Sequence, residues 1–212
     1  MITVEYSKKK KNFYKLFYDD EYIGCVPKSL VPEEFFLNND NSNDSPKTNE
    51  DEDYINTLKE WVYTNALNKL LEYLAKMEKT VLDCRIFLKR HEIPESVIIR
   101  VIKEAEEKNW LSDVRYADLY TEEAVLCGRS PLEIKHKLLL KKIDKTIVEN
   151  ALKEHYTSET KDEVLLNLIT SLIKKNHGLD KEILFEKIAT ALYRKGFKYN
   201  EYEDLLKKKI WI

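Results

Sequence analysis

The chain has 212 residues, of which 43% are hydrophobic and 35% are charged, and its 36 Lys and Arg against 38 Asp and Glu leave a net charge of −2. The charge density is well above the roughly 25% of an average globular domain, and 4 glycines and 5 prolines are too few for an all-β protein. The glycines are also too far apart to form a glycine-rich phosphate-binding loop, which excludes nucleotide-binding proteins of that class.

Residues 1–37 predict a small β segment. Residues 2–6, 13–18 and 22–26 are rich in β-branched and aromatic side chains, and Asp19-Asp20-Glu21 is typical of a turn. We expect these strands to form a meander that packs on another element, because so small a sheet is not stable alone.

Residues 38–53 form an acidic run without a large apolar side chain. Such a run cannot bury enough surface to offset the entropy of ordering it, so it predicts a flexible linker. Residues 1–53 hold 7 Lys and 12 Asp or Glu, a net charge of −5, whereas residues 54–212 hold 29 Lys or Arg and 26 Asp or Glu, a net charge of +3. An acidic segment that binds a partner is the alternative interpretation.

From Tyr54 onward, apolar residues recur every three or four positions, which predicts helices throughout. The longest helices are expected over residues 54–76, 112–127 and 158–175. The few prolines and glycines of this part fall between the expected helices, where connections belong.

Two segments fifty residues apart, 80–93 and 130–143, have matching patterns. Both begin with a helix-capping sequence, in which Thr80 or Ser130 precedes an acidic residue by three positions. The apolar positions then coincide, and a third copy fits fifty-four residues further on. The matched apolar triplets are Cys84, Ile134 and Ile188; Leu88, Leu138 and Leu192; and Ile93, Ile143 and Phe197.

We therefore predict a mainly α protein of three tandem three-helix repeats, at residues 54–108, 109–156 and 157–212, with the small β segment in front. Repeats of this kind bury their apolar faces on their neighbours and form an elongated, curved body. A basic pair ends the second helix of each repeat: Lys89-Arg90, Lys141-Lys142 and Arg194-Lys195. The candidate contact residues are Arg85, Lys89, Arg90, Lys135, Lys137, Lys141, Lys142, Arg194 and Lys195.

These cations have two interpretations. Lys and Arg that face one way neutralise phosphates and release counterions, which would make a nucleic-acid-binding stripe. Alternatively, they are ordinary helix-surface cations paired with neighbouring Asp and Glu.

Chemistry of other kinds finds little support in the sequence. The four histidines form no His-x-x-x-His pair and no ligand cluster with the cysteines, and no Gly-x-Ser-x-Gly motif marks a nucleophile. We expect no catalytic residues, no cofactor and no metal site.

The three cysteines, Cys25, Cys84 and Cys127, lie far apart, which predicts thiols in a reducing compartment. No segment has the ~18 apolar residues of a membrane span, so a cytoplasmic protein without membrane contact is expected.

Three motifs in this order resemble the RecX family of bacterial regulators of the RecA recombinase. Residues 111–117 (LSDVRYA) are similar to the family's Asp-x-Arg-aromatic-Ala run, and residues 128–138 (GRSPLEIKHKL) to its Gly-x-x-x-Ile-x-x-x-Leu stretch. Residues 192–197 (LYRKGF) resemble its Leu-x-Arg-Arg-Gly-Phe motif. The resemblance covers the chain from about Ala66 to the end. One departure is that the family usually has glycine near the end of each second helix, and only Gly196 keeps it.

The resemblance implies a regulator of DNA repair and recombination rather than an enzyme. Such proteins bind the RecA–DNA filament along its groove and inhibit strand exchange and the coupled ATP hydrolysis. It also allows contact with single- or double-stranded DNA, and we expect a monomer. A freestanding nucleic-acid-binding helical-repeat protein and a helical scaffold for another partner are the alternatives.

Overall fold

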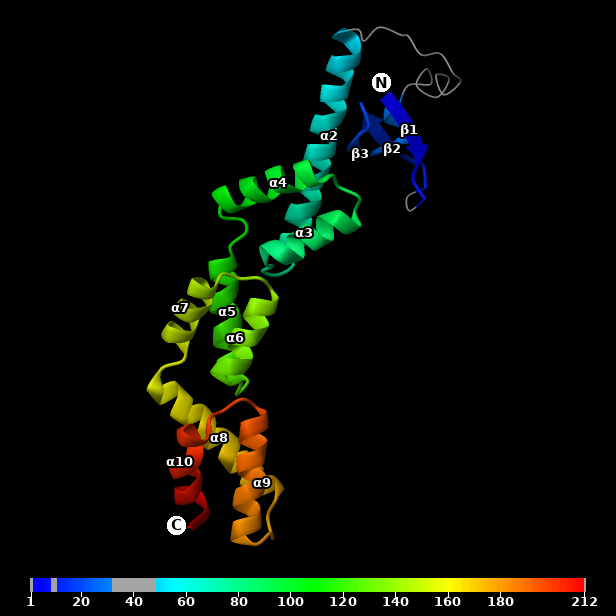
Figure 1. The fold of residues 1–212 in the computed structure, drawn as a ribbon. Helices are drawn as coiled ribbons and strands as arrows, with labels where there is room; N and C mark the ends of the chain where they lie inside the picture. Colours follow the sequence, from blue (N-terminus) through cyan, green and yellow to red (C-terminus); the bar gives the residue numbers. More distant parts are fainter. Residues whose placement is uncertain (1, 9–10, 32–48, 212) are drawn as a thin grey trace. The chain divides into compact units, whose positions relative to one another are not determined.

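The computed structural model describes residues 2–8, 11–31 and 49–211, and the fold is mainly α with a small N-terminal sheet (Figure 1). The prediction of a mainly α protein with a small N-terminal β segment is confirmed. The chain divides into two compact units, Met1–Ser112 and Asp113–Ile212. Within the described residues, no helix combines the length and apolar composition that crossing a bilayer demands.

The sheet of the first unit forms where the β-branched and aromatic runs predicted it. Its strands form an antiparallel meander in the order β1 (Ile2–Tyr6), β2 (Phe13–Tyr18) and β3 (Glu21–Pro27), followed by the 3₁₀ turn η1 (Lys28–Leu30). Asp19 and Asp20 between β2 and β3 both have positive φ, 48° and 64°, as a two-residue type I′ hairpin turn requires.

Helix α2 (Asn49–Leu74) supplies the surface on which the sheet packs. Five sheet and turn residues share a core with three residues of α2: Val4, Leu16, Ile23, Val26 and Val31 with Ile55, Leu58 and Val62. The approach is closest at Gly24, where a Cβ would lie 2.7 Å from Cγ2 of Val62. The sheet is therefore docked on the helix by apolar burial.

The start of α2 corrects the predicted linker. Residues 38–48 of that segment lie outside the described residues, but residues 49–53 are helical. The helix therefore begins five residues before the expected start at Tyr54 and ends two residues before the expected end at position 76. The helix dipole stabilises acidic side chains such as Glu52 and Asp53 near a helix N-terminus. A prediction from amino-acid composition does not include this effect of position.

Helices α3 (Val81–Arg90) and α4 (Glu95–Glu107) complete the first unit. They pack on the second half of α2 around buried residues that include Ala66, Leu70, Cys84, Leu88 and Ile98. Cys84 is therefore a core residue, as its place in the apolar stripe predicted, and Cys25 is buried in β3.

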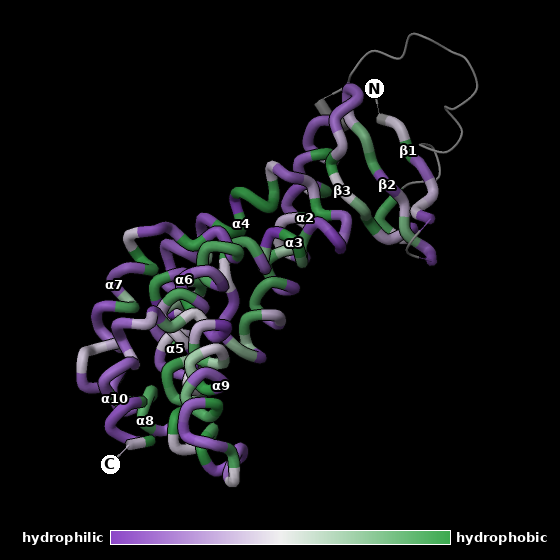
Figure 2. The backbone as a smooth tube through the Cα atoms, turned by 60° about the horizontal axis from the view of Figure 1, so that its bottom comes forward, coloured by the Kyte–Doolittle hydropathy of each residue, from purple (hydrophilic) through white to green (hydrophobic). Residues whose placement is uncertain are grey.

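The second unit contains two further groups of three helices around one core. The first group is α5 (Asp113–Leu126), α6 (Pro131–Leu140) and α7 (Lys145–His155), and the second is α8 (Ser158–Lys175), α9 (Lys181–Arg194) and α10 (Tyr199–Trp211). Hydrophobic and hydrophilic residues alternate along these helices, as amphipathic helices require (Figure 2).

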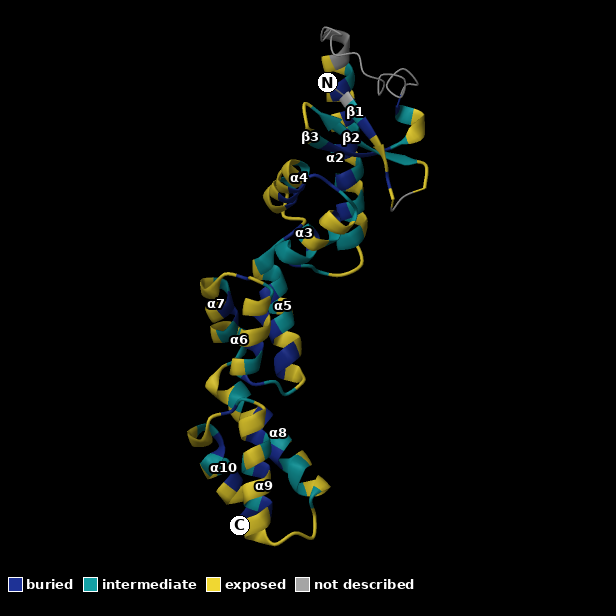
Figure 3. Ribbon diagram, turned by 45° about the vertical axis from the view of Figure 1, so that its right-hand side comes forward, coloured by how far each residue is buried: buried dark blue, intermediate teal, exposed yellow. Residues whose placement is uncertain are grey.

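We call α2–α4, α5–α7 and α8–α10 the first, second and third triplet. Buried residues recur along the helices of all three triplets (Figure 3). Equivalent positions in and just after the second helices are buried, as the matched sequence patterns predicted: Cys84, Ile134 and Ile188; Leu88, Leu138 and Leu192; and Ile93, Ile143 and Phe197. The capping sequences are formed as well, because Thr80 and Ser130 accept hydrogen bonds from the backbone N–H of Asp83 and Glu133. The boundaries assigned to the repeats stay predictions.

Candidate functional site

Each predicted basic pair lies at the C-terminal end of the second helix of its triplet. Helices α3 and α9 end at Arg90 and Arg194, and α6 ends one residue before Lys141. Cations are stabilised at this end of a helix, where the unpaired carbonyl groups carry partial negative charge. Local helix electrostatics therefore accounts for part of the basic pattern.

The residue that closes each turn has a left-handed backbone. Its φ is 59° at Glu92, 58° at Lys142 and 90° at Gly196. The three helix–helix turns are therefore equivalent in backbone conformation. We call them the first, second and third corner and define them as residues 89–92, 139–142 and 193–196. The glycine that is missing from the first two corners is thus replaced by residues that adopt the conformation glycine favours.

The cations beside the first corner are largely paired within the protein. Glu95, in the first turn of α4, forms an ion pair with Arg85 and a second one with Lys89, whose Nζ lies 3.0 Å from its carboxylate. Hydrogen bonds from Lys89 and then Arg85 lower the pKa of Glu95 below its usual range. The interpretation as ordinary surface pairs fits Arg85 and Lys89. Arg90 is exposed and has no ion pair with any described residue.

Glu92 of the first corner attaches the N-terminal sheet. Its carboxylate accepts a 3.2 Å hydrogen bond from Oγ of Ser7 and lies 3.7 Å from Nζ of Lys15. Its backbone carbonyl accepts a 2.7 Å hydrogen bond from the hydroxyl of Tyr22. Burial raises the pKa of Tyr22, and electrostatic interactions with Cys25 and Glu92 raise it further. The Tyr22 hydroxyl therefore stays a donor at neutral pH.

Two predicted cations are unpaired in and beside the second corner. Nζ of Lys135 lies 3.1 Å from the carboxylate of Glu149, which also lies 3.8 Å from Nζ of Lys145. Lys141 is half-buried and has a partner of its own. Lys137 and Lys142 are exposed, with no ion pair to any residue that the structure describes.

The third corner is held against the start of α6. The hydroxyl of Ser130 donates a 2.6 Å hydrogen bond to the carbonyl of Lys195, and a Cβ on Gly196 would lie 2.7 Å from that hydroxyl oxygen. Arg194 and Lys195 are exposed and make no ion pair within the described chain. Since α6 has 10 residues, the second corner at its other end lies about 15 Å away.

Large apolar side chains are exposed beside these cations. Leu139 and Leu140 precede the lysines of the second corner with exposed fractions of 40% and 60%. In the third corner, Tyr193 is 71% exposed. A surface that mixes unpaired cations with exposed leucine and tyrosine suits a protein partner, or a protein–DNA complex, better than bare phosphate.

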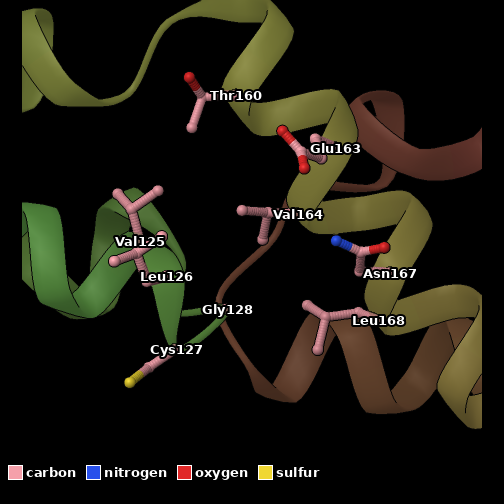
Figure 4. Close-up of a pocket in the computed structure, with 9 residues that line it drawn as sticks. All are labelled: Val125, Leu126, Cys127, Gly128, Thr160, Glu163, Val164, Asn167 and Leu168. Carbon is pink, nitrogen blue, oxygen red and sulfur yellow. The ribbon is translucent and has the colours of Figure 1, made fainter.

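A pocket of roughly 280 Å³ opens between the end of α5 and helix α8 (Figure 4). Most of its lining is apolar, with Glu163 as its one charged residue. The exposed thiol of Cys127 is directed away from α8 in this view. The pocket brings together none of the predicted cations.

The ion-pair partners Glu95 and Glu149 were not among the residues identified from the sequence. Both follow a helix–helix turn, 10 residues after Arg85 and 14 residues after Lys135. The available signal was an acidic residue early in the third helix of each triplet, opposite a basic second helix.

No family model matches the chain. The regulatory protein RecX of Streptococcus gordonii is 28% identical over 197 residues, which cover 92% of this chain and 72% of that protein. The regulatory protein RecX of Clostridium acetobutylicum is 26% identical over 211 residues, 97% of this chain and 94% of that protein.

Solved structures show the same likeness. A crystal structure of a regulatory protein RecX has a TM-score of 0.67 at 21% identity and covers 98% of this chain and 100% of that chain, which shows the shared fold. The crystal structure of RecX from Lactobacillus salivarius has a TM-score of 0.66 at 25% identity, covering 71% of this chain and 98% of that one.

Proposed function

We propose that this chain, because it belongs to the RecX family of regulatory proteins, binds the RecA–DNA filament and inhibits strand exchange and the coupled ATP hydrolysis. The regulatory role follows from the family. The filament as target, and inhibition as the outcome, are the parts that need an experiment.

The observation that carries the proposal is that five of the nine predicted contact cations are exposed and have no ion pair within the described chain. They are Arg90, Lys137, Lys142, Arg194 and Lys195. An exposed cation that the fold does not neutralise is available to a negatively charged partner. Arg85, Lys89 and Lys135 are not proposed as contacts, because carboxylates of the protein already pair with them.

Recurrence of the corners adds a second argument. A filament presents the same surface on every protomer, so a protein with several similar contact points engages it through several weak interactions at once. Linked contacts raise the overall affinity without a strong single contact. We expect the second and third corners to contribute most, because Glu92 in the first corner is committed to the sheet.

Direct binding to DNA is the second candidate function, and the same five cations favour it. Purely electrostatic DNA binding weakens steeply as salt rises, because it depends on counterion release. The exposed Leu139, Leu140 and Tyr193 argue for a contact with protein as well, since leucine side chains gain little from phosphate.

The test is the DNA-stimulated ATPase activity of RecA, measured with increasing amounts of this protein. We expect the rate to fall as the protein approaches the concentration of filament protomers. An unchanged rate at a stoichiometric excess would remove the proposal. Binding of the protein to the same DNA without RecA, measured across a salt series, separates the second candidate: strong, salt-sensitive binding that accounts for the inhibition would favour it.

A further inference from the structure

We propose that Asp118 on α5 and Glu154 and His155 at the end of α7 form a binding site for a divalent transition-metal ion such as Zn²⁺. Each residue offers one ligand atom, and the three atoms lie within 4.8 Å of one another. The sequence led us to expect no metal site, because the ligands come from helices that are far apart in the chain. The inference does not depend on the proposed function.

The packing of α5 against α7 brings the ligands together. His155 is the last residue of α7 and continues the face that carries the buried residues Val148 and Ala151, seven and four positions earlier. Its Nε2 lies 3.9 Å from Oδ1 of Asp118. This distance is too long for a hydrogen bond and leaves the nitrogen facing a carboxylate across a gap.

The second observation is that Nε2 of His155 is buried and has no hydrogen-bond partner among the described residues. Thr121, which is fully buried, also has a hydroxyl without a partner there. It lies one turn after Asp118 on the same face of α5. Buried polar atoms in native proteins normally have partners, so orphaned ones beside two carboxylates point to a missing ligand.

The donor set indicates the class of ion. Zinc binds imidazole nitrogen at 2.0–2.1 Å and carboxylate oxygen at 2.0–2.2 Å, so two ligand atoms of a tetrahedral zinc ion lie about 3.4 Å apart. The three atoms, which lie within 4.8 Å of one another, therefore have to approach by at most about 1.4 Å, a shift that side-chain rotation can supply. One imidazole and two carboxylates suit zinc and neighbouring transition metals rather than Ca²⁺ or Mg²⁺, which prefer oxygen ligands alone. Carbonyl groups at the end of α7 add favourable negative charge.

Such an ion would join the first and third helices of the second triplet next to the connection into α8. It would neutralise the carboxylates of Asp118 and Glu154 and fix the last turn of α7. Anything that binds the folded state alone stabilises it, so the metal is expected to raise the melting temperature of the protein.

The experiment is calorimetric titration of ZnCl₂ into the untagged 212-residue chain that carries Cys127→Ser, which removes an exposed thiol as a competing ligand. We expect saturable binding of one ion per chain and a higher melting temperature with zinc. His155→Ala and Asp118→Asn should each weaken binding at least about tenfold, since even residues behind the direct ligands change metal affinity by 10–100-fold.

His136→Ala is the matched control, because His136 is an exposed histidine on α6 of the same triplet. It should leave zinc binding unchanged. Glu154→Gln changes only an exposed side chain, so it tests the site even if the His155 variant unfolds. No saturable binding, or binding that survives both Glu154→Gln and Asp118→Asn, would overturn the proposal. An equal loss in His136→Ala would overturn it as well.

Discussion

The hydroxyl of Tyr22 donates a hydrogen bond to the backbone carbonyl of Glu92, a residue 70 positions further along the chain. Glu92 is the left-handed residue of the first corner, and its carboxylate also receives contacts from Ser7 and Lys15. The sheet thus occupies the corner of the first triplet. The corresponding residue of the second corner, Lys142, is exposed.

Replacing Tyr22 with phenylalanine should loosen the sheet while leaving its apolar contacts in place. The loss of one hydrogen bond to a partly buried carbonyl is expected to cost about 1 kcal/mol. Amide hydrogen exchange should therefore quicken in β1–β3. Tyr6→Phe is the control, because Tyr6 is exposed and its ring lies edge-on to that of Tyr14, a contact that phenylalanine keeps, so equal effects of both substitutions would contradict the account.

The left-handed residues of the first two corners predict opposite effects of the same substitution. Lys142→Gly should raise the free energy of unfolding by up to about 1 kcal/mol, because glycine adopts φ near 58° without the steric cost of a Cβ. Glu92→Gly should lower it, since the contacts to Ser7 and Lys15 are lost. Urea unfolding measures the free energy of unfolding of both variants. If Glu92→Gly stabilised the protein, the contacts of Glu92 to Ser7 and Lys15 would not contribute to stability.

Gly196→Ala tests how closely the third corner approaches α6. Gly178→Ala is the matched control, because Gly178 has φ of 86° and nothing within 4 Å of a Cβ, whereas Gly196 has φ of 90° and Ser130 at 2.7 Å. Backbone strain should cost each variant about 1–2 kcal/mol. Steric overlap should cost Gly196→Ala about 1–3 kcal/mol more. Equal destabilisation in chemical unfolding would mean that the Ser130 contact is not maintained in solution.

The ion pairs of Glu95 predict how its carboxyl titrates. Hydrogen bonds from Lys89 and Arg85 favour the ionised form, so its pKa lies below the ordinary value. The stability that these pairs add is present above the carboxyl pKa of the unfolded chain, and it is lost as the pH falls through the lowered pKa of the folded protein. The effect on stability is small, because the three side chains are exposed.

A carbon-detected NMR titration of the side-chain carboxyl group of Glu95 measures this pKa directly. Lys89→Ala should raise it toward the usual range. Lys103→Ala, which removes a cation paired with Glu107 instead, should leave it unchanged. A Glu95 carboxyl group that titrates normally in the wild-type protein would show that the two ion pairs are not formed in solution.

The fold was largely predictable because its signals are local. Runs of β-branched and aromatic residues marked β1 and β2, and Thr80 and Ser130 marked helix starts through their own hydrogen bonds. The start of α2 was missed because an acidic run was judged by its composition. A charged segment can still extend a helix that is anchored further along by buried residues such as Ile55 and Leu58.

The position of the basic pairs at helix ends was predictable from the sequence, but the ion pairs of the predicted cations were not. Helix-surface pairing rules consider residues three or four apart, whereas Arg85 and Lys135 pair across helix–helix turns. The cluster of Asp118, Glu154 and His155 was missed for the same reason, because it exists only once α5 and α7 are packed. Tertiary neighbours of this kind leave no spacing pattern in the sequence.

The most direct test of the central claim compares two double charge reversals in the RecA ATPase assay. Arg194→Glu with Lys195→Glu changes the third corner, and Lys174→Glu with Lys175→Glu makes the same change in charge at the exposed end of α8. We predict that the first variant needs about tenfold more protein for the same inhibition, while the second inhibits like the wild type. Equal inhibition by both variants, or equal loss in both, would contradict a specific contact at the corner.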